Sequence, residues 1–132
     1  CFGKHLVSGD NGIIYEYDVK SNTNAGDPLT RARVSPHYAS PQLKKVFYQR
    51  LELDCVVGYG IGGQSQANVM LRYSDDGGFS WNSWRTQTLG AVGQKQAKAR
   101  FNRLGSANDR VFEVRCSDDV PFAIVNAVII NA

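Results

Sequence analysis

The chain has 132 residues, of which 42% are hydrophobic and 20% charged, and its formal net charge at pH 7 is +3. This length suits one domain with a buried core, and the composition excludes an intrinsically disordered chain. The small excess of positive charge is far below that of a dedicated nucleic-acid-binding domain. The longest apolar stretch, residues 122–132, is too short to span a bilayer.

The first part of the chain predicts short strands. Residues 4–8 and 13–18 read as two strands joined by the turn sequence Gly9-Asp10-Asn11-Gly12. Residues 19–29 are polar, with Asn, Gly and Pro, and predict a loop. A further short strand is expected at residues 30–35.

Residues 44–57 show the clearest alternation in the chain. The apolar positions of one parity are Phe47, Leu51, Leu53, Cys55 and Val57. The polar positions of the other parity are Arg50, Glu52 and Asp54. A two-residue period predicts a strand with one buried face and one solvated face.

The remaining strands follow at short intervals. After the glycine-rich residues 58–63, residues 68–73 alternate and predict a strand, residues 75–78 a turn, and residues 79–88 the returning strand. Two more alternating segments, residues 97–104 and 111–116, follow.

The last predicted strand differs from the others. Residues 120–130 are apolar at nearly every position and predict a central strand that is covered on both faces. No stretch has helical periodicity, so the predicted fold class is all-β: an antiparallel β-sandwich built of hairpins, one of which carries an Asp-box turn. We expect residues 30–132 to form the sandwich and residues 1–18 to lead in from a larger protein upstream, because the chain begins with Cys1 rather than Met.

The most specific local pattern is residues 74–81 (SDDGGFSW), which fit the Asp-box pattern S-x-D-x-G-x-[ST]-W of sialidases and many other β-proteins. The carboxylate can accept backbone N–H bonds across the turn, glycine permits positive φ, and the tryptophan ring can pack over the hairpin. Such a box is a folding device. The predicted structural residues are Ser74, Asp76, Gly77, Gly78, Ser80 and Trp81.

No catalytic, metal or cofactor site is predicted. Glycoside hydrolysis needs two positioned carboxylates, and Glu52 and Asp54 would lie about 7 Å apart on one strand face, where solvation explains them equally well. His5 and His37 are isolated in sequence. The odd cysteine count gives no disulfide framework, and we expect Cys55 and Cys116 to be buried reduced thiols.

A basic cluster is the best candidate for a contact surface. It consists of Lys95, Lys98, Arg100, Arg103 and Arg110. Lys98, Arg100 and Arg103 are the candidates for contact with phosphate, DNA or a partner protein. The alternative is a solvated face that is balanced by acidic residues elsewhere, and the weight of the sequence favours it.

A carbohydrate-binding module is the runner-up function. Sugar binding needs exposed aromatic side chains on a flat or grooved face, and Tyr59, Trp81 and Trp84 are the set that could supply it.

Several blocks resemble the packaged-DNA stabilisation proteins, the tail accessory factors of short-tailed bacteriophages. Residues 71–82 (LRYSDDGGFSWN) resemble that family's LRWSDDGG-x-TWSN, and residues 103–114 (RLGSANDRVFEV) resemble RLG-x-A-x-DRVFEV. Residues 117–124 (SDDVPFAI) are similar to SDPV-x-VAI, and the start of the chain is similar to GKHLVGD…NGNIYEL. The loop at residues 92–96 is only loosely similar.

The resemblance implies a virion structural protein rather than an enzyme. Members of the family form a ring below the portal, seal the exit channel after packaging, and connect the portal and adaptor to the tail needle or spike. It further implies that residues 1–18 follow a propeller-like upstream region, that the protein is part of the virion tail, and that assembly takes place in the host cytoplasm. The family provides no catalytic residues to carry over.

Overall fold

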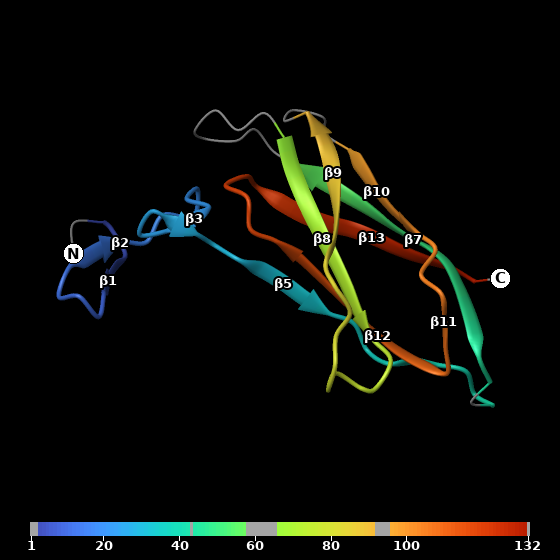
Figure 1. The fold of residues 1–132 in the computed structure, drawn as a ribbon. Coiled ribbons are helices and arrows are strands. Elements are labelled where there is room, and N and C mark those ends of the chain that lie inside the picture. Colours follow the sequence, from blue (N-terminus) through green and yellow to red (C-terminus); the bar gives the residue numbers. More distant parts are fainter. Residues whose placement is uncertain (1–2, 43, 58–65, 92–95, 132) are drawn as a thin grey trace.

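The computed structural model describes residues 3–42, 44–57, 66–91 and 96–131, and these contain strands and no helix (Figure 1). The first six strands are β1 (Leu6–Ser8), β2 (Ile14–Glu16), β3 (Thr23–Asn24), β4 (Asp27–Pro28), β5 (Arg31–Val34) and β6 (Tyr38–Ala39). The others are β7 (Val46–Val57), β8 (Gln66–Ser74), β9 (Arg85–Ala91), β10 (Ala97–Asn102), β11 (Ser106–Ala107), β12 (Asp109–Cys116) and β13 (Phe122–Asn131).

Two antiparallel sheets make up the main body. In one, β7 lies between β10 and β13, and β11 pairs with the start of β7. In the other, the order is β5-β12-β8-β9, and β6 pairs with the start of β12. The core lies between the sheets because alternate side chains of both point inward, as in β10, where Ala97, Ala99 and Phe101 are buried and the residues between them are exposed. The predicted all-β antiparallel sandwich is therefore confirmed.

The core cluster combines residues from both sheets. Its most deeply buried members include Leu53, Cys55, Val69, Leu71, Phe101, Leu104 and Val120. Full burial of such a side chain contributes roughly 1.5–3 kcal/mol, so this cluster is the main source of stability. Cys55 and Cys116 are buried and free, as predicted, and burial raises the pKa of the Cys55 thiol to about 11.

Residues 3–29, here called the arm, form two small hairpins. Strands β1 and β2 pair with each other, and β3 pairs with β4. The segment predicted as a loop, residues 19–29, therefore contains a short hairpin, whose turn has positive φ at Ala25 and Gly26. Figure 1 shows the β1–β2 hairpin standing apart from the two large sheets, to which the chain returns at β5.

Strand β9 begins later than predicted. The sequence suggested a return strand from Phe79, but residues 79–84 are not strand and β9 begins at Arg85. The cause is local hydrogen bonding, because Asn82 closes back on the preceding strand. Its side-chain oxygen accepts the N–H of Tyr73 at 2.6 Å, and its own N–H donates to the Tyr73 carbonyl at 3.0 Å.

One residue of the alternating strand β7 points the opposite way from the prediction. Phe47 is 61% exposed, whereas Tyr48 is buried. The alternation of inward and outward side chains shifts by one residue between Tyr48 and Leu51. There the β7 backbone forms hydrogen bonds with the turn at residues 103–105 and not with a regular strand. The N–H of Tyr48 donates to the Gly105 carbonyl at 2.8 Å, and the N–H of Arg103 donates to the Gln49 carbonyl at 2.9 Å.

The last strand is not the central strand that its apolar sequence predicted. Within the described residues, β13 pairs with β7 alone and forms an edge of its sheet. Val125 is 69% exposed and Val128 is also exposed. The prediction was wrong because a largely apolar strand is buried on both faces only when a neighbour covers each face.

Candidate functional site

The turn between β8 and β9 is closed by a hydrogen-bond network around Asp76. Ser74 Oγ donates to Asp76 Oδ1 at 2.6 Å and accepts the N–H of Gly78 at 2.8 Å. The N–H of Ser80 donates to Asp76 Oδ1 at 2.8 Å, and the Ser80 hydroxyl donates to Asp76 Oδ2. These bonds, from Ser74 first and then Ser80, hold the pKa of Asp76 well below its usual range.

The rest of the turn depends on backbone geometry. Gly77 and Gly78 have φ of 75° and 99°, a region that costs an L-residue conformational energy. The Trp81 ring lies back over the turn, and its Nε1–H donates to the Gly78 carbonyl at 3.0 Å. The Asp76 carboxylate thus accepts hydrogen bonds from the two serines of its own loop, which is how short polar side chains close turns.

Asp75, the neighbouring carboxylate, pairs with the most deeply buried cation of the described residues. Arg110 is 1% exposed, and its Nε and NH2 donate to the two oxygens of Asp75 at 2.5 Å and 2.7 Å. NH1 donates to the Leu104 carbonyl at 2.5 Å. The guanidinium also lies over three aromatic rings, those of Tyr48, Tyr73 and Phe112. Arg110 was predicted as part of a basic surface cluster. This was wrong, because its guanidinium is buried and paired with Asp75.

The residues before Arg110 form a compact corner between β10 and β12. Arg103 and Gly105 have positive φ, 56° and 75°, and Leu104 between them is fully buried. The N–H of Leu104 donates to the Tyr48 carbonyl at 3.2 Å. The Asp109 carboxylate accepts a hydrogen bond from His37 Nδ1 at 2.8 Å. The block at residues 103–110 is therefore structural.

An alternating stack of arginine and tryptophan side chains covers part of the outer face of the β5-β12-β8-β9 sheet. The Arg72 guanidinium lies 4.6 Å from the Trp81 ring centre and 4.5 Å from that of Trp84. Arg115 lies 4.6 Å from the Trp84 ring centre. Glu113, which is buried, accepts bonds from both arginines. Such stacks are typical of cation–π packing and rigidify a sheet face.

The solvated face of β10 carries paired charges. Lys98 Nζ lies 3.6 Å from Asp54, and Arg100 Nε lies 3.2 Å from Glu52, because β10 and β7 are neighbouring strands in register. Each of these two cations therefore has an acidic neighbour, and Glu52 is shared with Arg50. Lys95 lies outside the described residues.

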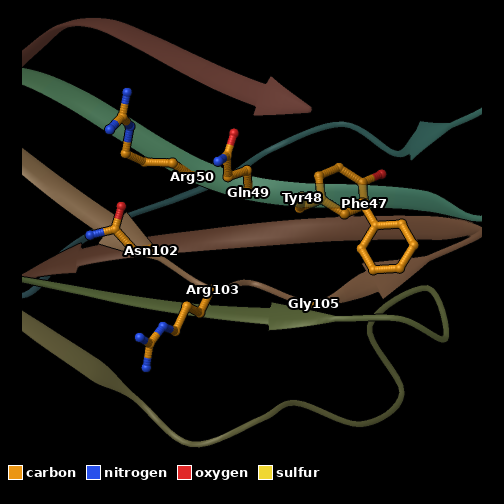
Figure 2. Close-up of a pocket in the computed structure, with 7 residues that line it drawn as sticks. All are labelled: Phe47, Tyr48, Gln49, Arg50, Asn102, Arg103 and Gly105. Carbon is orange, nitrogen blue, oxygen red and sulfur yellow. The ribbon is translucent and has the colours of Figure 1, made fainter. Parts of the chain in front are cut away.

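Arg103 lines a separate hollow of about 550 Å³. Its walls are formed by Phe47, Tyr48, Gln49, Arg50, Asn102, Arg103 and Gly105. Figure 2 shows the guanidinium groups of Arg50 and Arg103 pointing away from each other. Arg50 also pairs with Glu52 at 2.9 Å. The hollow therefore lacks the convergent cations that a phosphate site requires.

The geometry also weighs against the carbohydrate alternative. Arg72 and Arg115 lie over the rings of Trp81 and Trp84, and so occupy ring faces on which a sugar would stack. Tyr59 lies outside the described residues. Among the residues that the structure describes, no three His, Cys, Asp or Glu side chains gather as metal ligands would.

Comparison with known protein families matches residues 34–130 to the family described as "Bacteriophage P22 Gp10, beta-sandwich". The chain belongs to this family. The Gp10 β-sandwich match runs from the last residue of β5 to near the end of β13, and it contains both the turn at residues 74–81 and the block at residues 103–110. A comparison with curated proteins gave no match. The chain is thus a β-sandwich domain of a phage structural protein, in agreement with the resemblance to a tail protein.

The family match does not cover the whole chain. The arm lies outside the residues that match the Gp10 β-sandwich. Across the described part of the chain, no helix is present that is long and apolar enough to cross a membrane.

The sequence analysis did not predict the structural contacts of Asp75, Arg110 and Arg72. For Asp75 and Arg110 a signal was present, because the two motif blocks carry opposite charges that could pair.

Proposed function

We propose that this β-sandwich is the carboxy-terminal domain of a tail protein that closes and extends the portal channel of a short-tailed phage. The protein retains packaged DNA and links the portal and adaptor to the tail needle or spike. Its copies form a ring in the virion tail after assembly in the bacterial cytoplasm. The observation that carries this proposal is the Gp10 family match together with the two motif blocks of the tail accessory factors.

The physical character of the domain suits a mechanical role. The Arg110–Asp75 pair joins the β8–β9 turn to β12, and the Arg–Trp stack braces the outer sheet face. A channel plug must resist deformation, and paired buried charges together with close packing provide that resistance. Glu52, Asp54, Asp75 and Glu113 are all held in ion pairs, which supports a role without catalysis.

The test is capture of the full-length protein by a portal–adaptor complex, measured by light scattering of the protein alone, with portal alone, and with the complex. We expect stable capture by the complex and weaker capture by portal alone. Absence of capture combined with retention on a glycan array would overturn the proposal in favour of the carbohydrate module.

DNA binding by β10 is not needed for this role, and the pairing of Lys98 and Arg100 with acidic residues weighs against it. Neutralising both cations to glutamine should leave any binding to duplex DNA, and its salt dependence, unchanged. A salt slope that falls by about two would instead assign phosphate contacts to these side chains.

A further inference from the structure

The hollow of about 550 Å³ beside the start of β7 is both basic and aromatic. Among the described residues that line it are Arg50, Arg103 and Phe47, and none is acidic. Lys45, which is exposed, lies two residues before Phe47. Figure 2 shows the Phe47 ring at one end of the hollow and the two guanidinium groups at the other, directed to different sides. An aromatic side chain with negative charge near it suits this arrangement better than a phosphate does.

Arg103 occupies the wall of this hollow at a conformational cost. Its φ is 56°, in the left-handed region where a residue other than glycine is strained, and such strain is found at binding sites. The residue is exposed and forms no ion pair in the part of the chain that the structure describes. Glu52, the nearest acid in the sheet, is already shared between Arg50 and Arg100. The charge of Arg103 is therefore available to another molecule.

The β8–β9 turn has the complementary character. Phe79 in this turn is 94% exposed, and Figure 1 shows the turn as a loop that continues past the end of β8. Asp75 and Asp76 are exposed residues, whereas the Arg110 that pairs with Asp75 is buried, so the turn presents negative charge to solvent. Asp75 uses two of the roughly four acceptor sites of a carboxylate inside the fold, which leaves sites for an arginine outside it.

The fold fixes this turn before any partner binds. The hydrogen bonds of Asp76 to Ser74 and Ser80 close its backbone on both sides of Phe79. A phenyl group has no donor or acceptor, so Phe79 takes no part in these bonds, and its exposure keeps it out of the core. A rigid loop loses little conformational entropy on binding, and an exposed aromatic ring can bury roughly 150–250 Å². The turn is therefore a preformed aromatic projection.

Charge complementarity selects this turn, on a second copy, as the occupant of the hollow. Residues 74–81 carry two acidic residues and no basic one, whereas the described lining of the hollow has two arginines and no acid. Opposite charges on two surfaces steer their encounter and fix their register. Arginine and aromatic side chains are also the residues that carry most binding energy at protein interfaces.

We propose that the β8–β9 turn of one copy docks in the hollow of a second copy, with Phe79 inserted between Phe47 and the guanidinium groups of Arg50 and Arg103. The acidic residues of the turn then face the basic side of the hollow. The contact joins two different surfaces, so repeating it generates a closed ring when the rotation between copies permits. The inference rests on the proposed function in that a ring of copies is the assembly it explains.

Sedimentation of the 132-residue chain over a range of protein and salt concentrations tests the contact. We expect self-association that weakens as salt is added, because charges contribute to it. Phe79→Ser and Arg103→Asn should each weaken it by about ten-fold or more. The matched controls are Val125→Ser, at an apolar residue that is 69% exposed, and Lys98→Gln, and neither position lines the hollow or lies in the turn. A chain that stays monomeric at every concentration overturns the proposal.

The Arg103→Asn variant separates binding from folding. Asparagine tolerates positive φ better than arginine does, so the free energy of unfolding in urea should be unchanged or higher while association is lost. A fall in stability together with the loss of association would mean that Arg103 acts on the fold, and would overturn its assignment to the contact.

Mixing the two variants identifies the surfaces that meet. The Phe79→Ser chain keeps an intact hollow and the Arg103→Asn chain keeps an intact turn. An equimolar mixture should therefore form a one-to-one dimer with about the affinity of a single wild-type contact, although each variant alone stays monomeric. A mixture that remains monomeric would mean that like surfaces pair with each other, and would overturn the turn–hollow contact.

The two proposals can fail separately. Capture of the full-length protein by the portal–adaptor complex without self-association would keep the proposed function and overturn the turn–hollow contact. Self-association through these surfaces without capture would do the reverse.

Discussion

Replacing Asp75 with alanine would leave the guanidinium of Arg110 in the core without its charged partner. Arg110 is 1% exposed, so its charge cannot move into water without opening the turn between β8 and β9. Removing one partner of a fully buried ion pair costs about 3–5 kcal/mol. The Asp75 side chain is 44% exposed, however, and water can take part of its place. We therefore expect a loss of about 2–3 kcal/mol in the free energy of unfolding.

Urea denaturation followed by tryptophan fluorescence measures this loss, and a thermal scan should show a melting temperature lower by about 10 °C. Asp10→Ala is the matched control, because it removes the same charge from an exposed turn and should change stability by less than about 0.5 kcal/mol. The double variant Asp75→Ala, Arg110→Met should recover about 1 kcal/mol, since no buried charge is then left unpaired. Recovery should be incomplete because the Leu104 carbonyl also loses a donor. An Asp75→Ala protein as stable as Asp10→Ala would refute this reasoning.

Three more predictions concern the turn and the thiols. Gly77→Ala puts a β-carbon on backbone at φ 75°, so the free energy of unfolding in urea should fall by about 1–2 kcal/mol, and an unchanged midpoint would contradict this. Hydrogen bonds lower the pKa of Asp76, so its stabilising effect is present above about pH 4 and lost on acidification; wild type should lose stability more steeply than Asp76→Asn between about pH 5 and pH 2, and parallel curves would count against it. Burial raises the pKa of Cys55 to about 11, so in Cys1→Ser protein at pH 8 a thiol reagent should label Cys55 and Cys116 only after unfolding. The free energy of unfolding should also fall as the pH rises from about 9 toward 11, because the unfolded chain loses the thiol protons first. Fast labelling of the folded protein would refute the burial of the two thiols.

Local sequence patterns predicted the elements whose burial follows a simple period. The alternation from Leu51 to Cys55 and along β10 gave the correct inward faces because regular pairing continues through both strands. The same rule failed at Phe47, where β7 bonds a turn at residues 103–105 and its inward face changes. No pattern in the sequence of β7 predicts this contact, because the turn at residues 103–105 lies far along the chain from Phe47.

The charge and apolarity of a residue predicted its burial less well than periodicity did. Whether a charged or apolar side chain is buried depends on which strand packs beside it. Arg110 was counted as a surface cation, yet Asp75 and three aromatic rings enclose it. Lys98 and Arg100 are on the surface as expected, where register with β7 gives each an acidic neighbour. The apolar strand β13 became an edge, since the only described strand that pairs with it is β7. Each outcome was set by tertiary pairing rather than by the local sequence.

The two sequence blocks that carry the family resemblance meet in one ion pair. Asp75 comes from the first block and Arg110 from the second, 35 residues later, and their contact fixes the β8–β9 turn against β12. Substituting either residue alone breaks the pair, so each block constrains the other for reasons of stability. A motif that is fully engaged inside the fold is poorly suited to distinguish one partner from another.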